Sequence, residues 1–181
     1  MNKKALVIVD VQNDFANPKG SLYVKGGEKI ASLVNSIAAN YDMVVATRDW
    51  HPPGHISFGV WPQHCVAGEW GAQLDPQLDE TKIHAIINKG LDLNVDSYSG
   101  VKDNEGGNIT GLHRLLSGMN KIDVVGIAFD YCVKFTAIDL KKSLTDSNVD
   151  IIVHKNMTAS VNPQEDSKNI AELNEAGVAV I

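Results

Sequence analysis

Short, continuous apolar runs alternate along the chain with longer segments in which apolar residues recur every three or four positions. The run ALVIVD at 5–10 ends in a carboxylate and is typical of a strand buried on both faces. Residues 28–40 carry apolar side chains at the spacing of an amphipathic helix. Further strands are predicted at 43–46, 84–89, 121–128, 150–154 and 177–181. Further helices are predicted at 109–117, 131–144 and 163–175.

This alternation of strands and helices is typical of α/β proteins with right-handed crossover connections. We therefore predict a three-layer, doubly wound fold, in which a mostly parallel six-stranded sheet carries helices on both faces. Ligands of such folds bind beyond the carboxyl ends of the strands, where the strand order reverses. Asp10, Asp49, Lys89 and the turn at 128–132 all fall at predicted carboxyl ends, which makes this edge the expected site. The connection at 50–80 is longer than a simple loop between two elements requires, so we expect it to contribute residues to this site.

Composition narrows the class of protein. The 181 residues are expected to form a single domain, 1–181, long enough to bury a full core. The net charge of −6, with no basic cluster, argues against a nucleic-acid partner, and no apolar run approaches membrane-spanning length. The first residues lead directly into an apolar strand rather than a signal-peptide core, which predicts a cytoplasmic protein. No glycine-rich phosphate-binding motif is present, so a nucleotide cofactor is not expected.

Cys132 is the candidate nucleophile. It lies in VGIAFDYC at 125–132, between a predicted strand and a predicted helix. Unpaired amides and the positive end of the helix dipole at such a turn favour a thiolate and can hold an oxyanion. Gly126 and the small Ala128 indicate a close approach of the backbone to a ligand. The alternative is a buried core thiol, and Cys65, which forms no Cys-x-x-Cys pair, is expected to be free as well.

Asp10 and Lys89 would complete a reactive set with Cys132. A carboxylate that directly ends a buried strand is costly unless a thiol or a cation lies within reach. The alternative role is capping a turn, which suits Asp14 better. Lys89 at the end of its strand would stabilise negative charge on the other two groups, although an isolated lysine there is usually solvated. Together the three residues supply a proton carrier, a cation and a nucleophile.

The segment 48–65 combines a carboxylate with several imidazoles. Asp49 and His51 are two positions apart, so their side chains point to the same side of an extended segment, and His64 follows in the same Pro- and Trp-rich stretch. Such a set suits one divalent metal ion, with zinc preferred and iron or manganese as alternatives. His55 is a further candidate ligand. The alternative is a group of ordinary surface histidines.

Aromatic side chains near these groups are candidate walls of a pocket. They are Phe15, Trp61, Trp70 and Tyr98. Packing alone explains most such aromatics, but a flat aromatic substrate needs at least one stacking partner.

Several of these segments together resemble one known family. They are DVQNDF at 10–15, GSLYVKGGEKI at 20–30, TRDWHPPGHISF at 47–58, WPQHCVAGEWGAQL at 61–74, NKG at 88–90, DSYSG at 96–100 and GIAFDYCVKFTAIDL at 126–140. In this order they are similar to the nicotinamidases (pyrazinamidases) of the isochorismatase-like cysteine hydrolase superfamily, and the match spans most of the chain.

The resemblance implies roles for the reactive residues. The catalytic triad of the family would fall on Asp10, Lys89 and Cys132. Its oxyanion hole would be formed by the backbone amides of Ala128 and Cys132, next to a cis peptide bond between Ile127 and Ala128.

The resemblance also implies binding roles. The metal ligands would be Asp49, His51 and His64, and His55 matches a position that supplies a further ligand in some members. The implied substrate walls are Phe15, Trp61 and Tyr98. The chain departs from the family at Phe129, where threonine is common, and this change would reshape the edge of the pocket.

The implied function is hydrolysis of nicotinamide, and of pyrazinamide, to the acid and ammonia through a cysteine thioester, as part of NAD salvage. One alternative is a related cysteine hydrolase of another small amide or ureido substrate. Another is a non-enzymatic module that binds a metal or a ligand on the same scaffold. The expected partner is a small molecule, and a homo-oligomer is consistent with the family, although the chain has no interface signature.

Overall fold

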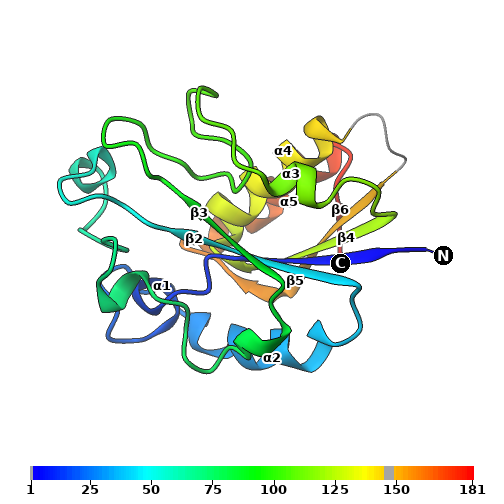
Figure 1. Cartoon of the computed structure of the whole chain (residues 1–181), viewed down its shortest axis with the longest axis horizontal. Coiled ribbons are helices and arrows are strands. Elements are labelled where there is room, and N and C mark those ends of the chain that lie inside the picture. Colours follow the sequence, from blue (N-terminus) through cyan, green and yellow to red (C-terminus); the bar gives the residue numbers. More distant parts are fainter. Residues whose placement is uncertain (1, 145–148) are drawn as a thin grey trace.

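The computed structural model describes residues 2–144 and 149–181. Its sheet has six strands in the order β3-β2-β1-β4-β5-β6, and every neighbouring pair is parallel (Figure 1). The strands are β1 (Lys4–Val9), β2 (Met43–Asp49), β3 (Ala85–Lys89), β4 (Lys121–Ile127), β5 (Asp150–Ala159) and β6 (Ala179–Val180). The helices are α1 (Asn13–Ala16), α2 (Ile30–Ala38), α3 (Leu112–Leu115), α4 (Lys134–Ser143) and α5 (Asp166–Glu175). The predicted doubly wound α/β fold is confirmed.

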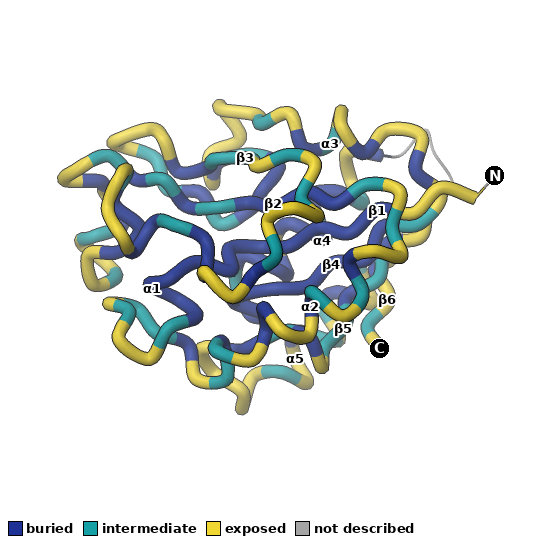
Figure 2. Tube along the Cα trace, turned by 60° about the horizontal axis from the view of Figure 1, so that its bottom comes forward, coloured by how far each residue is buried: buried dark blue, intermediate teal, exposed yellow. Residues whose placement is uncertain are grey.

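Helices cover both faces of the sheet. Alternate residues of β1 point to opposite faces, so Leu6 belongs to one apolar cluster with Val34 of α2. Val7 belongs to the other cluster, with Leu140 of α4 and Leu173 of α5. Figure 1 accordingly shows α2 on one side of the sheet and α3, α4 and α5 on the other. The buried positions run along the central strands between these layers (Figure 2).

Several elements differ in extent from the sequence prediction. The helix predicted at 109–117 is limited to α3, because Gly111 directly precedes it and Gly118 turns the chain away with a φ of 80°. The helix predicted at 131–144 begins as a π turn, Phe129–Val133, that leads into α4. In β5 the strand continues to Ala159, past an irregularity in its pairing with β4.

Gly126 has a different role from the predicted one. Its φ is 120°, and a Cβ atom there would lie 2.1 Å from the carbonyl oxygen of Val9. The glycine therefore allows the backbones of β1 and β4 to approach each other, and not the approach of a ligand. This close contact lies just before Asp10 and just before the turn that carries Cys132, so it brings the ends of β1 and β4 together where the strand order reverses.

Within residues 2–144 and 149–181, no helix combines the length and the apolar character needed to cross a membrane.

Candidate active site

Lys89 is the centre of a buried polar cluster. The residue is 2% exposed, and its Nζ lies 3.0 Å from Asp10 Oδ2 and 2.5 Å from Asp49 Oδ1. The same Nζ donates to the carbonyl oxygen of Ser97 at 2.8 Å and lies 3.6 Å from Cys132 Sγ. The structure thus brings the three predicted reactive groups together. It also adds Asp49, which the sequence pattern assigned only to the metal site.

The backbone after β1 holds Asp10 in an unusual conformation. Asp10 is fully buried and has a left-handed φ of 48°, which is uncommon for a residue other than glycine. Thr47 of β2 donates its hydroxyl to Asp10 Oδ1 at 2.7 Å, and Lys89 approaches the other oxygen. Burial raises the pKa of Asp10, although the neighbouring ammonium acts in the opposite direction. This carboxylate is therefore a better proton acceptor than an exposed one.

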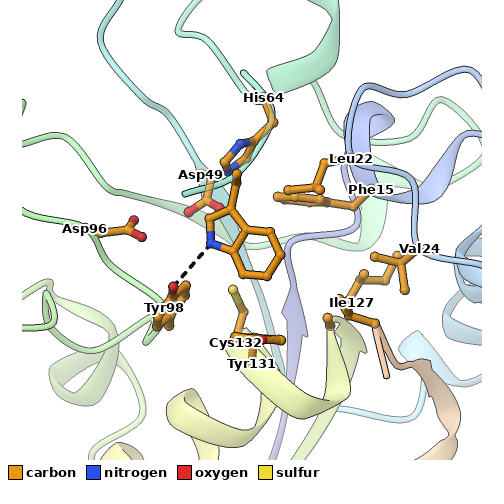
Figure 3. Close-up of a pocket in the computed structure, with 13 residues that line it drawn as sticks. Phe15, Leu22, Val24, Asp49, His64, Asp96, Tyr98, Ile127, Tyr131 and Cys132 are labelled. Atoms are coloured by element: carbon orange, nitrogen blue, oxygen red, sulfur yellow. Dashed lines mark hydrogen bonds between the residues drawn. The ribbon is translucent and has the colours of Figure 1, made fainter. Parts of the chain in front are cut away.

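Cys132 faces the cavity rather than the core. Figure 3 shows its sulfur directed into the pocket, and the residue is 8% exposed. Burial raises the pKa of the Cys132 thiol well above its ordinary value, and the lowering effect of Lys89 does not offset it. Burial therefore shifts the pKa of this thiol in the opposite direction to the one predicted from its place before a helix. A base must take that proton before the sulfur can attack.

The turn before Cys132 wraps around one carbonyl group. The backbone N–H groups of Tyr131 and Val133 both donate to the carbonyl oxygen of Ala128, at 3.2 and 3.0 Å. The peptide bond between Ile127 and Ala128 is cis, as the resemblance implied. Ala128 and Cys132 both line the cavity.

Asp49, His51 and His64 form a compact group of metal-binding side chains. One ligand atom from each lies within 4.8 Å of the ligand atoms of the other two, and all three residues are buried. His51 Nε2 lies 3.6 Å from Asp49 Oδ2 and has no hydrogen-bond partner among the described residues. Burial alone would raise the pKa of Asp49, but Lys89 and His51 outweigh it and hold that pKa far below the usual range. A buried anion beside an unpartnered imidazole nitrogen fits a divalent cation.

Backbone carbonyls orient both imidazoles of this group. His51 Nδ1 lies 2.9 Å from the carbonyl oxygen of Gly90, and His64 Nδ1 lies 2.7 Å from that of Pro62. A carbonyl only accepts, so in each neutral ring Nδ1 carries the hydrogen and Nε2 keeps a free lone pair, which is the usual arrangement of a metal-binding histidine. A Cβ atom at Gly90 would lie 2.4 Å from His51 Cε1, which explains the glycine after Lys89.

His55 lies beside this group, and both of its ring nitrogens are hydrogen-bonded. Its ring stacks on that of His51 with centroids 4.0 Å apart. His55 Nδ1 accepts from the backbone N–H of Ser57 at 3.3 Å, and Nε2 therefore donates to the carbonyl oxygen of Val95 at 3.3 Å. Asp96 approaches the His51–His55 pair, and these three form a second group with ligand atoms within 4.8 Å.

Aromatic and aliphatic side chains enclose a cavity above Cys132 (Figure 3). Phe15, Trp61 and Tyr98 line it, as predicted for the substrate walls. Trp61 Nε1 donates to the hydroxyl of Tyr98 at 3.2 Å, which fixes the two rings relative to each other. Trp70 is 52% exposed and does not line this cavity, so its predicted place in the wall is wrong.

The sequence pattern missed several members of this wall. They are Leu22, Val24, Asp96, Ile127, Tyr131 and Val161. Tyr131 directly precedes Cys132 and meets Trp61 edge-on with ring centroids 5.2 Å apart, so its position in the chain was an available signal. Val161 follows β5 in a segment with no local sign of a binding role.

A family model matches almost the whole chain. The model described as the isochorismatase domain matches residues 4–181. The chain belongs to the isochorismatase family. A nicotinamidase of Acinetobacter baylyi is 39% identical to it over 170 residues, which cover 82% of this chain and 79% of the relative.

Two solved structures are closely similar to this chain in fold. PnC1 from L. infantum, in complex with nicotinate, has a TM-score of 0.93 and 39% identity, covering 99% of this chain and 92% of that one. The pyrazinamidase of Pyrococcus horikoshii, in complex with zinc, has a TM-score of 0.83 and 32% identity, covering 99% and 98%.

Proposed function

We propose that this member of the isochorismatase family is a nicotinamidase that hydrolyses nicotinamide, and also pyrazinamide, to the acid and ammonia. The observation that carries the proposal is the contact of Lys89 with Asp10 and with Cys132, which lines an aromatic cavity beside a group of metal-binding side chains. The nicotinamidases among its relatives, and the neighbour that holds nicotinate, support the same assignment.

The first half of the reaction forms a thioester. Asp10, whose pKa is raised by burial, takes the thiol proton of Cys132. The Lys89 ammonium, held by two carboxylates, stabilises the resulting thiolate. The sulfur attacks the carboxamide carbon, and the backbone amides of Ala128 and Cys132 stabilise the oxyanion, each donor lowering the barrier by roughly 3 kcal/mol.

The second half regenerates the enzyme. Asp10 gives its proton to the amide nitrogen, which leaves as ammonia when the C–N bond breaks. A water molecule then attacks the thioester, with Asp10 as its base. The C–S bond breaks, the Cys132 thiolate takes the proton that Asp10 received from the water, and the carboxylic acid leaves.

The substrate ring is expected to lie between Phe15 and Trp61, with the amide over Cys132. Asp49, His51 and His64 would hold the divalent cation, proposed to be zinc because the neighbour from Pyrococcus horikoshii contains it. A bound cation there would offer a Lewis-acid site for the ring nitrogen. His55 is proposed to support the ring of His51 rather than to ligate, because both of its nitrogens are engaged.

The test is ammonia release from nicotinamide by the wild type and by Cys132→Ala, each with and without a chelator. We expect Cys132→Ala to lose turnover while it keeps its fold and its zinc affinity. The matched control is Cys65→Ala, which removes the other buried thiol, absent from the cavity wall, and is expected to retain most turnover.

The result also separates the rival functions. Release of ammonia from another amide or a ureido compound, but not from nicotinamide, would assign a sister hydrolase. Stoichiometric zinc binding with no turnover of any amide would assign a binding module. Substantial activity in Cys132→Ala would overturn the thioester route.

A further inference from the structure

The carboxylate of Asp14 joins two segments that both reach the candidate site. Asp14 lies in α1 and is 8% exposed. Its Oδ1 accepts the backbone N–H of Ser21 at 3.0 Å, and its Oδ2 accepts the backbone N–H of Cys65 at 2.7 Å. Its own carbonyl oxygen accepts the N–H of Leu22 at 3.2 Å. One residue therefore anchors three peptide groups.

The contact with Cys65 acts directly on the metal-binding group. The N–H that Asp14 accepts belongs to the peptide bond between His64 and Cys65, so the carboxylate orients the backbone that carries the His64 ring. Cys65 has a left-handed φ of 47°, a conformation that residues other than glycine rarely adopt. Its carbonyl oxygen accepts the N–H of His51 at 2.9 Å. The Cys65 backbone thus links both imidazole residues, and Asp14 holds it in place.

The contacts with Ser21 and Leu22 act on the substrate wall. Leu22 lines the cavity, and so does Phe15, the residue after Asp14. The ring of Phe15 lies 5.6 Å from that of His64, centroid to centroid. Because Asp14 holds the Leu22 segment and the His64 peptide at once, it sets the distance between the apolar wall and the imidazoles.

Two glycines leave room for Asp14 because they have no side chain. A Cβ atom at Gly71 would lie 1.9 Å from Asp14 Oδ2, and one at Gly20 would lie 2.4 Å from the Asp14 carbonyl oxygen. The carboxylate is therefore confined by backbone on the side of the 64–71 segment as well as by its hydrogen bonds. The Asp14 carboxylate therefore binds the backbone of two other segments, whereas its sequence position predicts that it caps a local turn.

We infer that Asp14 is a positioning residue that sets both the cation affinity of the Asp49–His51–His64 group and the fit of the substrate ring. The effect on the fit of the substrate ring rests on the proposed function, whereas the effect on cation affinity does not. Asp14 touches neither group through its own side chain and acts through the peptide after His64 and through the wall at Leu22.

The test is Asp14→Asn in the full-length, metal-free protein, titrated with Zn²⁺ against a competing chelator. An amide of the same size has only one acceptor, so its NH₂ group would face either Ser21 N–H or Cys65 N–H. We expect zinc affinity to fall by about tenfold or more, the size of effect seen when groups supporting a metal ligand are removed. At saturating zinc we expect KM for nicotinamide to rise several-fold, with kcat changed less.

The matched control is Asp79→Asn. Asp79 also accepts a backbone N–H, from Thr81 at 3.1 Å, but it does not line the cavity. We expect its zinc affinity and KM to equal those of the wild type. If Asp14→Asn fails to fold, Gly71→Ala displaces the same carboxylate without removing it and must also lower zinc affinity.

A folded Asp14→Asn protein with wild-type zinc affinity would overturn the inference, as would an equal loss in the Asp79 control. Both outcomes are distinct from failure of the proposed function, because the zinc titration requires no turnover.

Discussion

Replacing Lys89 by methionine removes the only cation in contact with Asp10 among the described residues and leaves the apolar stem of the side chain in place. Two buried carboxylates, Asp10 and Asp49, then face each other without a counter-charge. We expect the variant to be inactive and markedly less stable, since a charge left unpaired in the interior is costly.

The magnitude follows from the contact distances. At 3.0 Å between Lys89 Nζ and Asp10 Oδ2, an effective dielectric constant near 20 gives an attraction of about 5 kcal/mol. Removing one partner of a buried pair typically costs about 3–5 kcal/mol. We therefore expect Lys89→Met to lower the free energy of unfolding by about 4 kcal/mol.

The assay is urea unfolding of the metal-free proteins at pH 7, extrapolated linearly to water. The decisive comparison is the double variant Lys89→Met/Asp10→Asn. Asparagine tolerates the left-handed backbone of position 10 and keeps an oxygen for the hydroxyl of Thr47. Because it removes one of the two unpaired charges and leaves Asp49 as the other, we expect the double variant to recover about 2 kcal/mol relative to Lys89→Met.

Additive destabilisation by the two substitutions would contradict this expectation. Additivity would mean that the ammonium and the Asp10 carboxylate do not stabilise each other, and that the cost of Lys89→Met comes from packing alone.

Three further predictions concern one residue of the metal-binding group, His51, and two residues of β4, Asp123 and Gly126. His51→Ala should lower zinc affinity at least about 100-fold and raise KM for nicotinamide in parallel, whereas His113→Ala should do neither; calorimetry and steady-state kinetics check this. Asp123→Asn should cost about 2–3 kcal/mol of stability at pH 7, because the buried carboxylate accepts from three donors. Burial would raise the pKa of Asp123, but these donors lower it, so the wild-type advantage should fade as pH falls below about 4; an advantage that grows in acid would contradict this. Gly126→Ala should cost about 4 kcal/mol or more, because its Cβ would lie 2.1 Å from a backbone oxygen, and a near-native Tm would be contrary evidence.

Much of the candidate site could be read from the chain because its residues lie where periodic patterns stop. A buried parallel strand requires a continuous apolar run, and Asp10 directly ends one such run, while Asp49 and Lys89 follow within three residues of the ends of two others. Parallel strands deliver their carboxyl ends to one edge, and the topology alone brings these residues near the turn that holds Cys132.

Other features could not be read locally, because they depend on which segments become neighbours. Val161 lines the cavity only because β5 ends beside the turn after β4, and Gly126 is needed only because Val9 packs against it. The raised pKa of the Cys132 thiol likewise follows from its desolvation within the assembled site and not from its place before a helix.

The amino-acid order thus determined the strands, the fold class and the identity of the reactive groups, since those depend on short-range periodicity and on side-chain chemistry. Tertiary structure decided the raised pKa of the Cys132 thiol, the membership of the cavity wall and the contacts of Asp14. These depend on solvent exclusion and on contacts between distant segments, neither of which leaves a periodic trace in the chain.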